Sequence, residues 1–256
     1  EFGSIEAGDD VSICDTSYQL NGVGANINTI NWTTSGSGIF SNSNILNPVY
    51  IASLQDVIFG SATLTVTAEN NNPCQGIISD SVVLTFIEGP IVFAGQDTSI
   101  CEGESYYLLE ASTDNTSSIL WTTNGDGVFD STTTLNATYF PGLLDIQNGV
   151  VSIILNGTGT PPCSNAVDVM ELTIIQNPEI VIPNATIIWC IDDLPLVISG
   201  VSASNYATIL WSSSGTGTFN NNTLLNPTYF PSPIDLVTGV DLTITAIPLN
   251  NCPLVS

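Results

Sequence analysis

The chain repeats itself three times, and this repetition limits the folds that it can adopt. Cysteines recur at positions 14, 101 and 190, which are 87 and 89 residues apart. Tryptophans follow at nearly the same spacing, at Trp32, Trp121 and Trp211. Aspartates recur as well, each four residues before a glycine, at Asp56, Asp145 and Asp235. Three sets of landmarks in one order indicate an array of small domains, one from each copy.

The landmarks divide the chain into copies at residues 5–90, 91–178 and 179–256. The opening residues 1–4 (EFGS) precede the first copy and are interpreted as a cloning remnant. The third copy stops shortly after Cys252, so we expect its last strand to be missing. Each junction contains a proline, Pro90 or Pro178, and lacks a Gly/Ser-rich linker. This composition predicts a semi-rigid rod of successive domains.

Short alternating and apolar runs, broken by Gly, Asn, Ser and Pro, favour strands over helices. In the middle copy we predict strands at 91–95, 105–111, 117–123, 127–130, 136–140, 149–157 and 168–176. Seven short strands within one copy are typical of an immunoglobulin-like Greek-key sandwich. The fold class is therefore all-β, with three such immunoglobulin-like sandwiches in tandem. Trp121 is expected in the core, on the third strand.

Two local motifs recur in the copies. The segments GSG, GDG and GTG are predicted to supply the positive φ angles of tight hairpins. Ser53 and Asp56 have the spacing of a capping box at the start of a single helical turn. Asp145 and Asp235 occupy the same place in the other copies, so these aspartates are expected to have a structural role. The same is expected of the three tryptophans.

Six cysteines are distributed as two per copy. Pairing within each copy is the simplest prediction, giving Cys14–Cys74, Cys101–Cys163 and Cys190–Cys252. Each bond would tie one pole of its sandwich. Zinc binding is disfavoured because two sulfurs without a histidine or a CxxC motif make a poor site. Disulfides imply an oxidising, extracellular compartment.

Lys, Arg and His are absent, whereas Asp and Glu total 24. Nucleic-acid binding is excluded because no cation can neutralise a phosphate. Catalytic histidines and lysines are also excluded, and no site is presented in a form that suggests an enzyme. No apolar run reaches the roughly 18–20 residues that span a membrane.

The carboxylates nevertheless offer weak calcium candidates, since Ca²⁺ prefers oxygen ligands. They lie near the starts of the first two copies and in GDGVFD, at Asp9, Asp10, Asp97, Asp126 and Asp130. For Asp126 and Asp130 the alternative is an ordinary solvated turn, because the equivalent segments GSGIFS and GTGTFN carry no acid at either place. Apart from calcium, no cofactor is expected. Aromatic residues could line a sugar-binding face, although core packing is the default expectation; they are Tyr106, Tyr107, Tyr139, Phe140, Tyr229 and Phe230.

The repeat resembles the PKD/Ig-like repeats of giant surface proteins of gliding Bacteroidota, the SprB-type gliding-motility adhesins. The residues that carry the resemblance are AGQDTSICEGES (94–105), the segment 120–159 and PCSNAVDVMELTI (162–174). It implies export by type IX secretion, display on the cell surface, and a role in adhesion or gliding. The predicted function is a structural stalk or filament, whose partners are neighbouring repeats and a surface polysaccharide or substratum. The alternative is a glycan- or calcium-dependent binding module.

Overall fold

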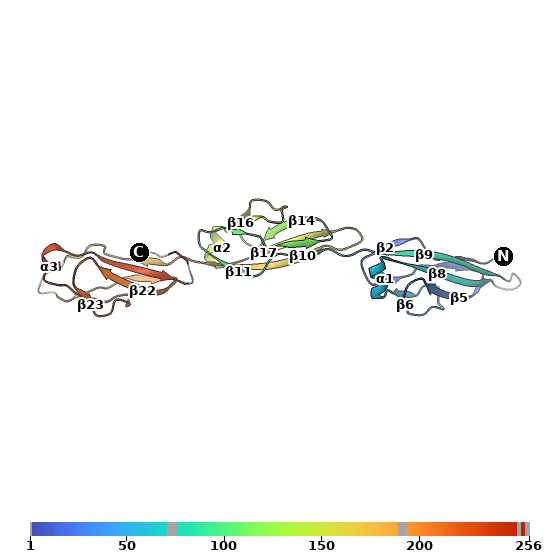
Figure 1. The fold of residues 1–256 in the computed structure, drawn as a ribbon, viewed down its shortest axis with the longest axis horizontal. Helices are drawn as coiled ribbons and strands as arrows, with labels where there is room; N and C mark the ends of the chain where they lie inside the picture. The colour runs from blue at the N-terminus through green and yellow to red at the C-terminus, as the bar shows by residue number, and fades with distance from the viewer. Residues whose placement is uncertain (1, 71–75, 189–193, 250–251, 254–256) are drawn as a thin grey trace. The chain divides into compact units, whose positions relative to one another are not determined.

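The computed structural model describes residues 2–70, 76–188, 194–249 and 252–253. The three copies repeat one set of elements, small β-sheets and a single short helix (Figure 1). The predicted all-β array of immunoglobulin-like repeats is therefore confirmed. Within the described residues, none of the helices has the length and apolar character needed to cross a membrane.

In its described residues, the first copy contains nine strands and one helix. The strands are β1 (Ser4–Glu6), β2 (Val11–Ile13), β3 (Ser17–Gln19), β4 (Val23–Ala25), β5 (Ile27–Thr34), β6 (Ile39–Phe40), β7 (Val49–Ile51), β8 (Ser61–Asn70) and β9 (Ile77–Phe86). The helix, α1 (Leu54–Phe59), immediately precedes β8. Ser4 pairs with Ala25 across β1 and β4, so the fold starts one residue before the predicted boundary.

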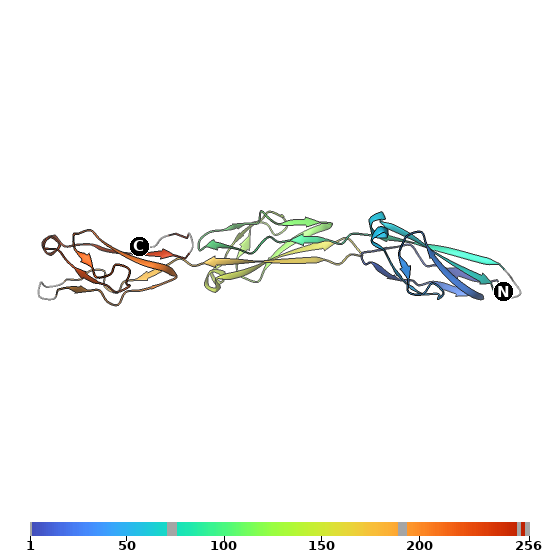
Figure 2. The same ribbon diagram turned by 60° about the horizontal axis from the view of Figure 1, so that its bottom comes forward.

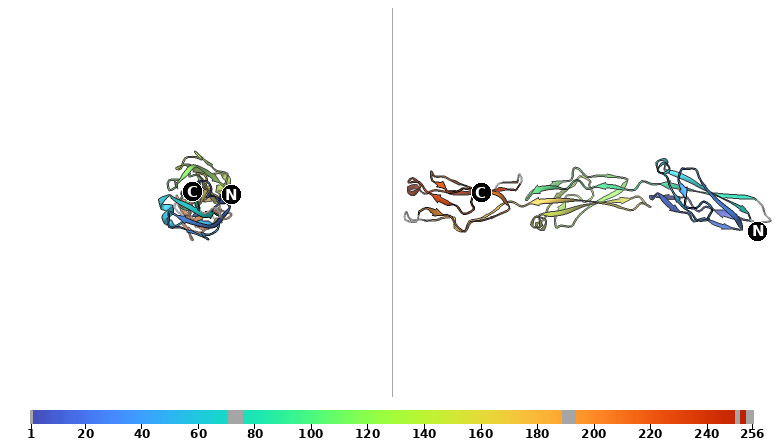
Figure 3. Two further views of the ribbon diagram at one scale, coloured as in Figure 1. Left: turned by 90° about the vertical axis from the view of Figure 1, so that its right-hand side faces the viewer. Right: turned by 90° about the horizontal axis from the view of Figure 1, so that it is seen from below.

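The sheets of the first copy follow from the alternation in its long strands. In β8, every second side chain is buried, from Ala62 to Ala68, and the side chains between them are only partly buried. The sheet order is β2-β9-β8-β5, and β2 runs parallel to β9. A second sheet has the order β3-β7-β6, and β1 pairs with β4. Figures 2 and 3 show the long strands of this copy side by side, in blue to cyan.

The middle copy has the same arrangement. Its elements are β10 (Ile91–Phe93), β11 (Thr98–Cys101), β12 (Tyr106–Tyr107), β13 (Ser112–Asp114), β14 (Thr116–Thr123), β15 (Val128–Phe129), β16 (Thr138–Phe140), α2 (Leu143–Asn148), β17 (Val150–Gly159) and β18 (Ala166–Ile175). The sheets are β11-β18-β17-β14, β12-β16-β15 and β10-β13. A strand lies in each of the seven predicted ranges. The sequence did not predict β11 and β13.

The third copy contributes β19 (Glu179–Val181), β20 (Leu196–Val197), β21 (Ser202–Ser204), β22 (Tyr206–Ser213), β23 (Thr218–Phe219), β24 (Thr228–Phe230), α3 (Asp235–Thr238) and β25 (Leu242–Pro248). Its sheets are β20-β24-β23, β19-β21 and β22-β25. The described residues of the third copy thus repeat the element order of the first two copies, without counterparts of β2 and β9.

A chain of three aromatic rings forms the centre of each copy. In the middle copy Trp121 packs on Phe129, which packs on Tyr139, with ring centroids 6.0 and 4.9 Å apart. The indole N–H of Trp121 donates to the carbonyl oxygens of Thr134 and Leu135, at 3.1 and 3.2 Å. This bond gives the buried indole the partner that it requires. The other copies repeat the chain with Trp32, Phe40 and Tyr50, and with Trp211, Phe219 and Tyr229.

The described chain divides into two compact units, and the boundary passes through the middle copy. The first unit comprises Glu1–Phe93, Ser112–Leu120 and Leu155–Asp168. The second comprises Ala94–Ala111, Trp121–Ile154 and Val169–Ser256. Segments of the middle copy thus group with the first copy and with the third.

The disulfides differ from the prediction. Cys14 of the first copy is bonded to Cys163 of the middle copy, and Cys101 of the middle copy is bonded to Cys252 of the third. The predicted bonds Cys14–Cys74, Cys101–Cys163 and Cys190–Cys252 are therefore wrong, because Cys14, Cys101, Cys163 and Cys252 have other partners. Cys74 and Cys190 lie outside the described residues. Each observed bond lies within one compact unit and links consecutive copies.

Candidate functional site

One polar cluster recurs in every copy and centres on a buried aspartate. In the first copy Asp56 is only 1 % exposed. It accepts hydrogen bonds from the Tyr50 hydroxyl at 2.8 Å, the Ser53 backbone N–H at 3.0 Å and the Ser37 backbone N–H at 2.8 Å. Ser53 in turn accepts from the Asp56 N–H at 3.2 Å, which completes the predicted capping box. These donors compensate the buried charge.

The other two copies reproduce the cluster. Asp145 accepts from the Tyr139 hydroxyl at 2.6 Å and from the backbone N–H groups of Asp126, Gly127 and Gly142. Asp235 accepts from the Tyr229 hydroxyl at 2.8 Å and from the backbone N–H groups of Thr216, Gly217 and Ser232. Four donors around one carboxylate form a site that holds a helical turn against a hairpin.

Burial and hydrogen bonding shift the pKa of several groups in the clusters of the first and third copies. Burial favours the neutral form of Asp56, but hydrogen bonds from Ser37, Ser53 and Tyr50 outweigh burial and hold its pKa below the ordinary value. The hydrogen bond from the Ser232 backbone is the main cause of the lowered pKa of Asp235. Burial is the main cause of the raised pKa of Tyr50. The pKa of Asp56 is shifted down and the pKa of Tyr50 is shifted up, so both shifts lead away from the neutral range that a general acid or base needs.

The glycines of the GSG, GDG and GTG turns serve this cluster. None of them has a positive φ angle, so the predicted backbone role is wrong. A Cβ on Gly36 would overlap the Asp56 carboxylate, and one on Gly38 would overlap the Tyr50 hydroxyl. Gly125 and Gly127 meet Asp145 and Tyr139 in the same way. Glycine is required here because the hairpin backbone approaches the buried pair closely.

The middle copy builds its helix cap from a different residue. Gly142 has no side chain to cap α2, and Asp126 accepts the N–H groups of Leu144 at 3.1 Å and Asp145 at 3.2 Å instead. In the first copy the same two positions are Ser37 and Ser53, whose hydroxyls lie 2.7 Å apart. The third copy has Thr216 and Ser232, also 2.7 Å apart. In the middle copy, Asp126 therefore compensates for the missing capping side chain at Gly142.

Three other calcium candidates have structural partners. Asp10 accepts from the Val83 N–H, and Asp97 accepts from the Glu171 N–H at the equivalent place, both at 2.8 Å. Asp130 accepts from the Thr138 N–H at 2.8 Å. Ser41 and Asn220 bond the equivalent strands in the other copies, at 3.0 and 2.9 Å.

The remaining candidate, Asp9, is exposed. The described residues contain no group of three or more acidic or cysteine side chains placed to hold a metal ion. The structure therefore does not gather the predicted calcium candidates into one site.

The aromatic candidates for a sugar-binding face separate into two groups. Tyr139 and Tyr229 are fully buried and belong to the aspartate clusters. Tyr107, Phe140 and Phe230 are about half exposed, at 51, 46 and 46 %. Core packing therefore accounts for Tyr139 and Tyr229 but not for the three exposed rings.

The junction between the first two copies is held by the disulfide and by side chains that the sequence did not single out. Cys14 and Cys163 have their Cα atoms 5.3 Å apart. The Asn115 side-chain amide donates to the Glu88 carboxylate at 3.2 Å. Asn115 adopts a left-handed φ of 53°, which asparagine tolerates better than most residues. The linker is thus bonded to the copy that follows it.

The second junction is hydrogen-bonded to the middle copy and to the third copy. The Gln176 amide donates to the Ile146 and Gln147 carbonyl oxygens at the end of α2, at 2.8 and 3.3 Å. The next residue, Asn177, donates its N–H to the Glu102 carboxylate at 2.9 Å, and its carbonyl accepts from the Asn205 amide at 3.4 Å. Asn205 has a φ of 57°, matching Asn115. The recurrence of asparagine at this place is the sequence signal that could have revealed the contact.

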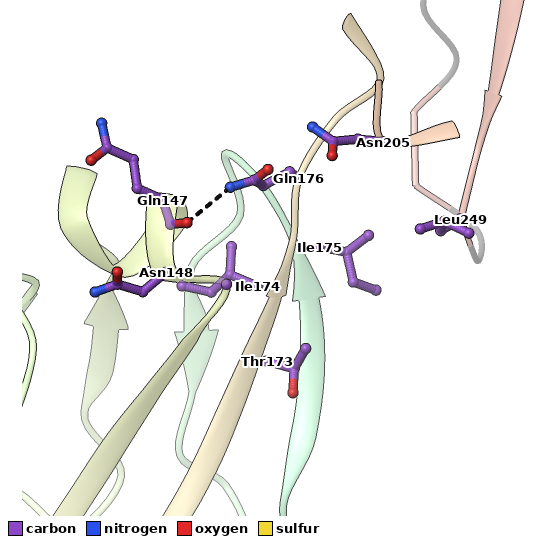
Figure 4. A pocket seen from close by; sticks show the side chains of 9 residues that line it. Gln147, Asn148, Thr173, Ile174, Ile175, Gln176, Asn205 and Leu249 are labelled. Carbon is purple, nitrogen blue, oxygen red and sulfur yellow. Dashed lines mark hydrogen bonds between the residues drawn. The ribbon is translucent and has the colours of Figure 1, made fainter. Parts of the chain in front are cut away.

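A surface pocket lies at this second junction, within the second unit. Figure 4 shows Gln147, Gln176 and Asn205 around it, with Leu249 on the side of the third copy. Its polar groups are mainly amides, and no charged side chain lines it. Gln176 is already used by the α2 carbonyls, so the pocket is mainly a feature of the junction.

Comparisons with known proteins identify no family. No family model matches the chain, and no curated protein matches it. Among solved structures, extracellular cadherin domains 1–4 of protocadherin gamma B7 are 10 % identical, with a TM-score of 0.43 over 99 % of this chain and 74 % of that one. Domains EC22–24 of mouse cadherin-23 are 11 % identical, with a TM-score of 0.38 over 95 % and 92 %.

The eight N-terminal Ig domains of the Down syndrome cell adhesion molecule are 13 % identical, with a TM-score of 0.39 over 97 % of this chain and 40 % of that one. Such weak likenesses carry no inference about ligand or partner.

Proposed function

We propose that the chain is a structural stalk segment of an extracellular surface adhesin. The observation that carries the proposal is the use of the recurring residues. The aspartates, tyrosines, tryptophans and hairpin glycines of all three copies are occupied in folding. What the copies share builds the repeat, and among the described residues it leaves no further polar site that all three copies have in common.

The covalent links at the junctions support a mechanical function. Each linker is short, and consecutive copies are joined by a disulfide as well as by the backbone. Disulfides persist in oxidising compartments, which favours a location outside the cell. The net charge of −24 without a cation disfavours compact self-association, because like charges repel.

Small-angle scattering tests the stalk directly. The proposed boundaries at 5–90, 91–178 and 179–256 predict three domains in an extended, monodisperse particle. A compact particle, with the maximum dimension of a single globule of this mass, would contradict the stalk. The measurement should be made at moderate salt, about 0.15 M, because charge repulsion between domains is then largely screened and does not itself extend the particle.

The resemblance of the repeats to SprB-type adhesins supports a finer proposal: display by type IX secretion on a gliding bacterium. An antibody against the chain should label intact cells of the organism that produces it. Loss of the label on deletion of the secretion machinery would support this route. Label confined to permeabilised cells would contradict surface display.

The alternative is a glycan- or calcium-dependent binding module. The exposed rings of Tyr107, Phe140 and Phe230 are the observation that favours glycan binding. A glycan array and a calorimetric titration with Ca²⁺ test the two forms of this alternative. Saturable binding lost in Phe140→Ala, with Leu109→Ala as an exposed apolar control, would support it over a purely structural stalk.

A further inference from the structure

The two disulfides are interlocked along the sequence. Cys14–Cys163 closes a loop of 149 residues, and Cys101–Cys252 closes a loop of 151 residues. Cys101 lies within the first loop, and Cys163 lies within the second. The loops therefore overlap over the 62 residues between Cys101 and Cys163. Disulfides within single copies would give separate loops without overlap.

We propose that this interlocking limits how far the chain can lengthen under tension. A taut chain is loaded along the shortest covalent path between its ends. From Cys14 that path crosses to Cys163, returns along the backbone to Cys101, and crosses to Cys252. Only 62 of the 238 residues from Cys14 to Cys252 then bear the load. The middle copy bears it in the reverse direction.

The limit applies even when every copy is unfolded. At about 3.5 Å per extended residue, 62 residues span about 220 Å and 238 residues about 830 Å. The backbone on either side of the loaded segment, 87 residues before Cys101 and 89 after Cys163, stays slack. When a stalk with this connectivity is fully unfolded, its taut length between Cys14 and Cys252 is therefore about a quarter of that of a chain without disulfides.

The cysteines lie where burial protects their disulfides from reduction. Cys163 and Cys252 are buried, at 8 and 6 % exposure, and Cys101 ends strand β11, which pairs with β18. Low access slows attack by an external thiolate. The biological use of the limit rests on the proposed stalk function, whereas the limit itself is a property of the isolated chain.

Single-molecule stretching of the full chain, with handles at both termini, tests the inference. Cys74→Ser and Cys190→Ser are introduced first, so that only the four paired cysteines remain. The expected taut length between Cys14 and Cys252 is about 220 Å, and it rises about fourfold after reduction with a dithiol. A further Cys14→Ser leaves 87 loaded residues and about 300 Å, and Cys101→Ser instead leaves 89 residues and about 310 Å.

One outcome overturns the inference directly. If cysteines pair within copies, only Cys101–Cys163 can form in this variant, and 176 residues then give a taut length of about 620 Å. A chain whose length is unchanged by the reductant would overturn it too. If scattering shows a compact particle but stretching gives a taut length of about 220 Å, the stalk proposal is contradicted and the interlocked disulfides are supported.

Discussion

At the scale of single residues, the buried aspartate explains several features that seem unrelated in the sequence. It explains why a tyrosine lies six residues before it, why a serine or glycine starts the helix, and why the hairpin contains glycines. A charge that is 1–2 % exposed needs all of these donors and the space around them. Its recurrence in three copies is explained by folding, because its contacts hold the helix start against the hairpin in each copy.

Asp56→Asn should destabilise the first copy by about 1–3 kcal/mol. The amide brings two N–H donors toward groups that are themselves donors, so at least one backbone N–H near Ser37 or Ser53 loses its acceptor. Hydrogen exchange resolved by peptide, across β7 and β8, measures the loss in this copy alone. Asp9→Asn, at an exposed position, is the matched control and should leave exchange unchanged.

The effect of Asp56→Asn should depend on pH. The folded pKa of Asp56 lies below that of an unfolded aspartate, about 3.9, so its stabilisation is complete above that value and is lost as pH falls through the folded pKa. The difference in stability between wild type and variant should therefore shrink below about pH 4. A constant difference from pH 7 to pH 2 would contradict an ionised Asp56.

The pair Asp126 and Gly142 should behave as a coupled unit. Gly142→Ser alone places a Cβ on the Asp126 carboxylate, and Asp126→Ser alone removes the acceptor of two helix N–H groups. The double variant recreates the Ser37 and Ser53 arrangement and should be more stable than either single variant. Thermal unfolding of the four proteins should give a coupling energy of about 0.5–3 kcal/mol. Additive effects would show that the caps act independently.

At the scale of elements, sequence reasoning succeeded where burial alternates and missed two strands of the middle copy, β11 and β13. The long strands β8 and β17 bury every second residue, so their pattern is clear. Strand β11 has four residues and pairs in parallel with the distant β18, and β13 consists of Ser-Thr-Asp. Neither carries a periodic signal of its own. Their formation depends on tertiary pairing that a local pattern does not contain.

The hairpin glycines illustrate a second kind of failure. A GxG motif predicts positive φ because glycine is commonly used for that purpose, whereas here it provides room. The reason appears only when Tyr50 and Asp56, distant in sequence, are placed against the turn. The local motif was therefore recognised correctly, but its cause lay in the packing.

Gly38→Ala tests this cause. The added methyl group would overlap the Tyr50 hydroxyl and the Ile51 carbonyl oxygen, so the hairpin must move away from the cluster. We expect a loss of about 1–3 kcal/mol, typical of overpacking. Gly89→Ala is the control, because its Cβ meets no atom within 4 Å and its φ is not positive. Equal stability of the two variants would show that the turn has room to spare.

At the scale of the whole molecule, the disulfides show the limit of reasoning from spacing. In a periodic chain a cysteine is as regularly spaced from its counterpart in the next copy as from the one in its own. Spacing alone therefore cannot choose between separate staples and a linked series. The structure places Cys14 beside Cys163 and Cys101 beside Cys252, which makes each junction a covalent unit. In the chain-entropy model, one loop of about 150 residues stabilises the fold by about 5 kcal/mol.

The same period makes a prediction for Cys74 and Cys190, which lie outside the described residues. Cys190 is in register with Cys14 and Cys101, and Cys74 is in register with Cys163 and Cys252. Because the first kind of cysteine bonds the second kind in the following copy, Cys190 of one molecule matches Cys74 of another. Oxidation of concentrated chain should give head-to-tail oligomers that a reductant disperses.

Two single variants sharpen this prediction. Besides the four cysteines of the two disulfides, the Cys74→Ser chain keeps only Cys190, and the Cys190→Ser chain keeps only Cys74. Each variant alone should therefore stay mostly monomeric on a non-reducing gel. Mixed and oxidised, they should form a dimer that grows no further, because each molecule contributes one matching cysteine. Peptide mapping should recover Cys190 linked to Cys74 beside intact Cys14–Cys163 and Cys101–Cys252. Homodimers as abundant as the mixed dimer would mean that the junction does not select its partner, and that the copies are linked by chance collision of thiols.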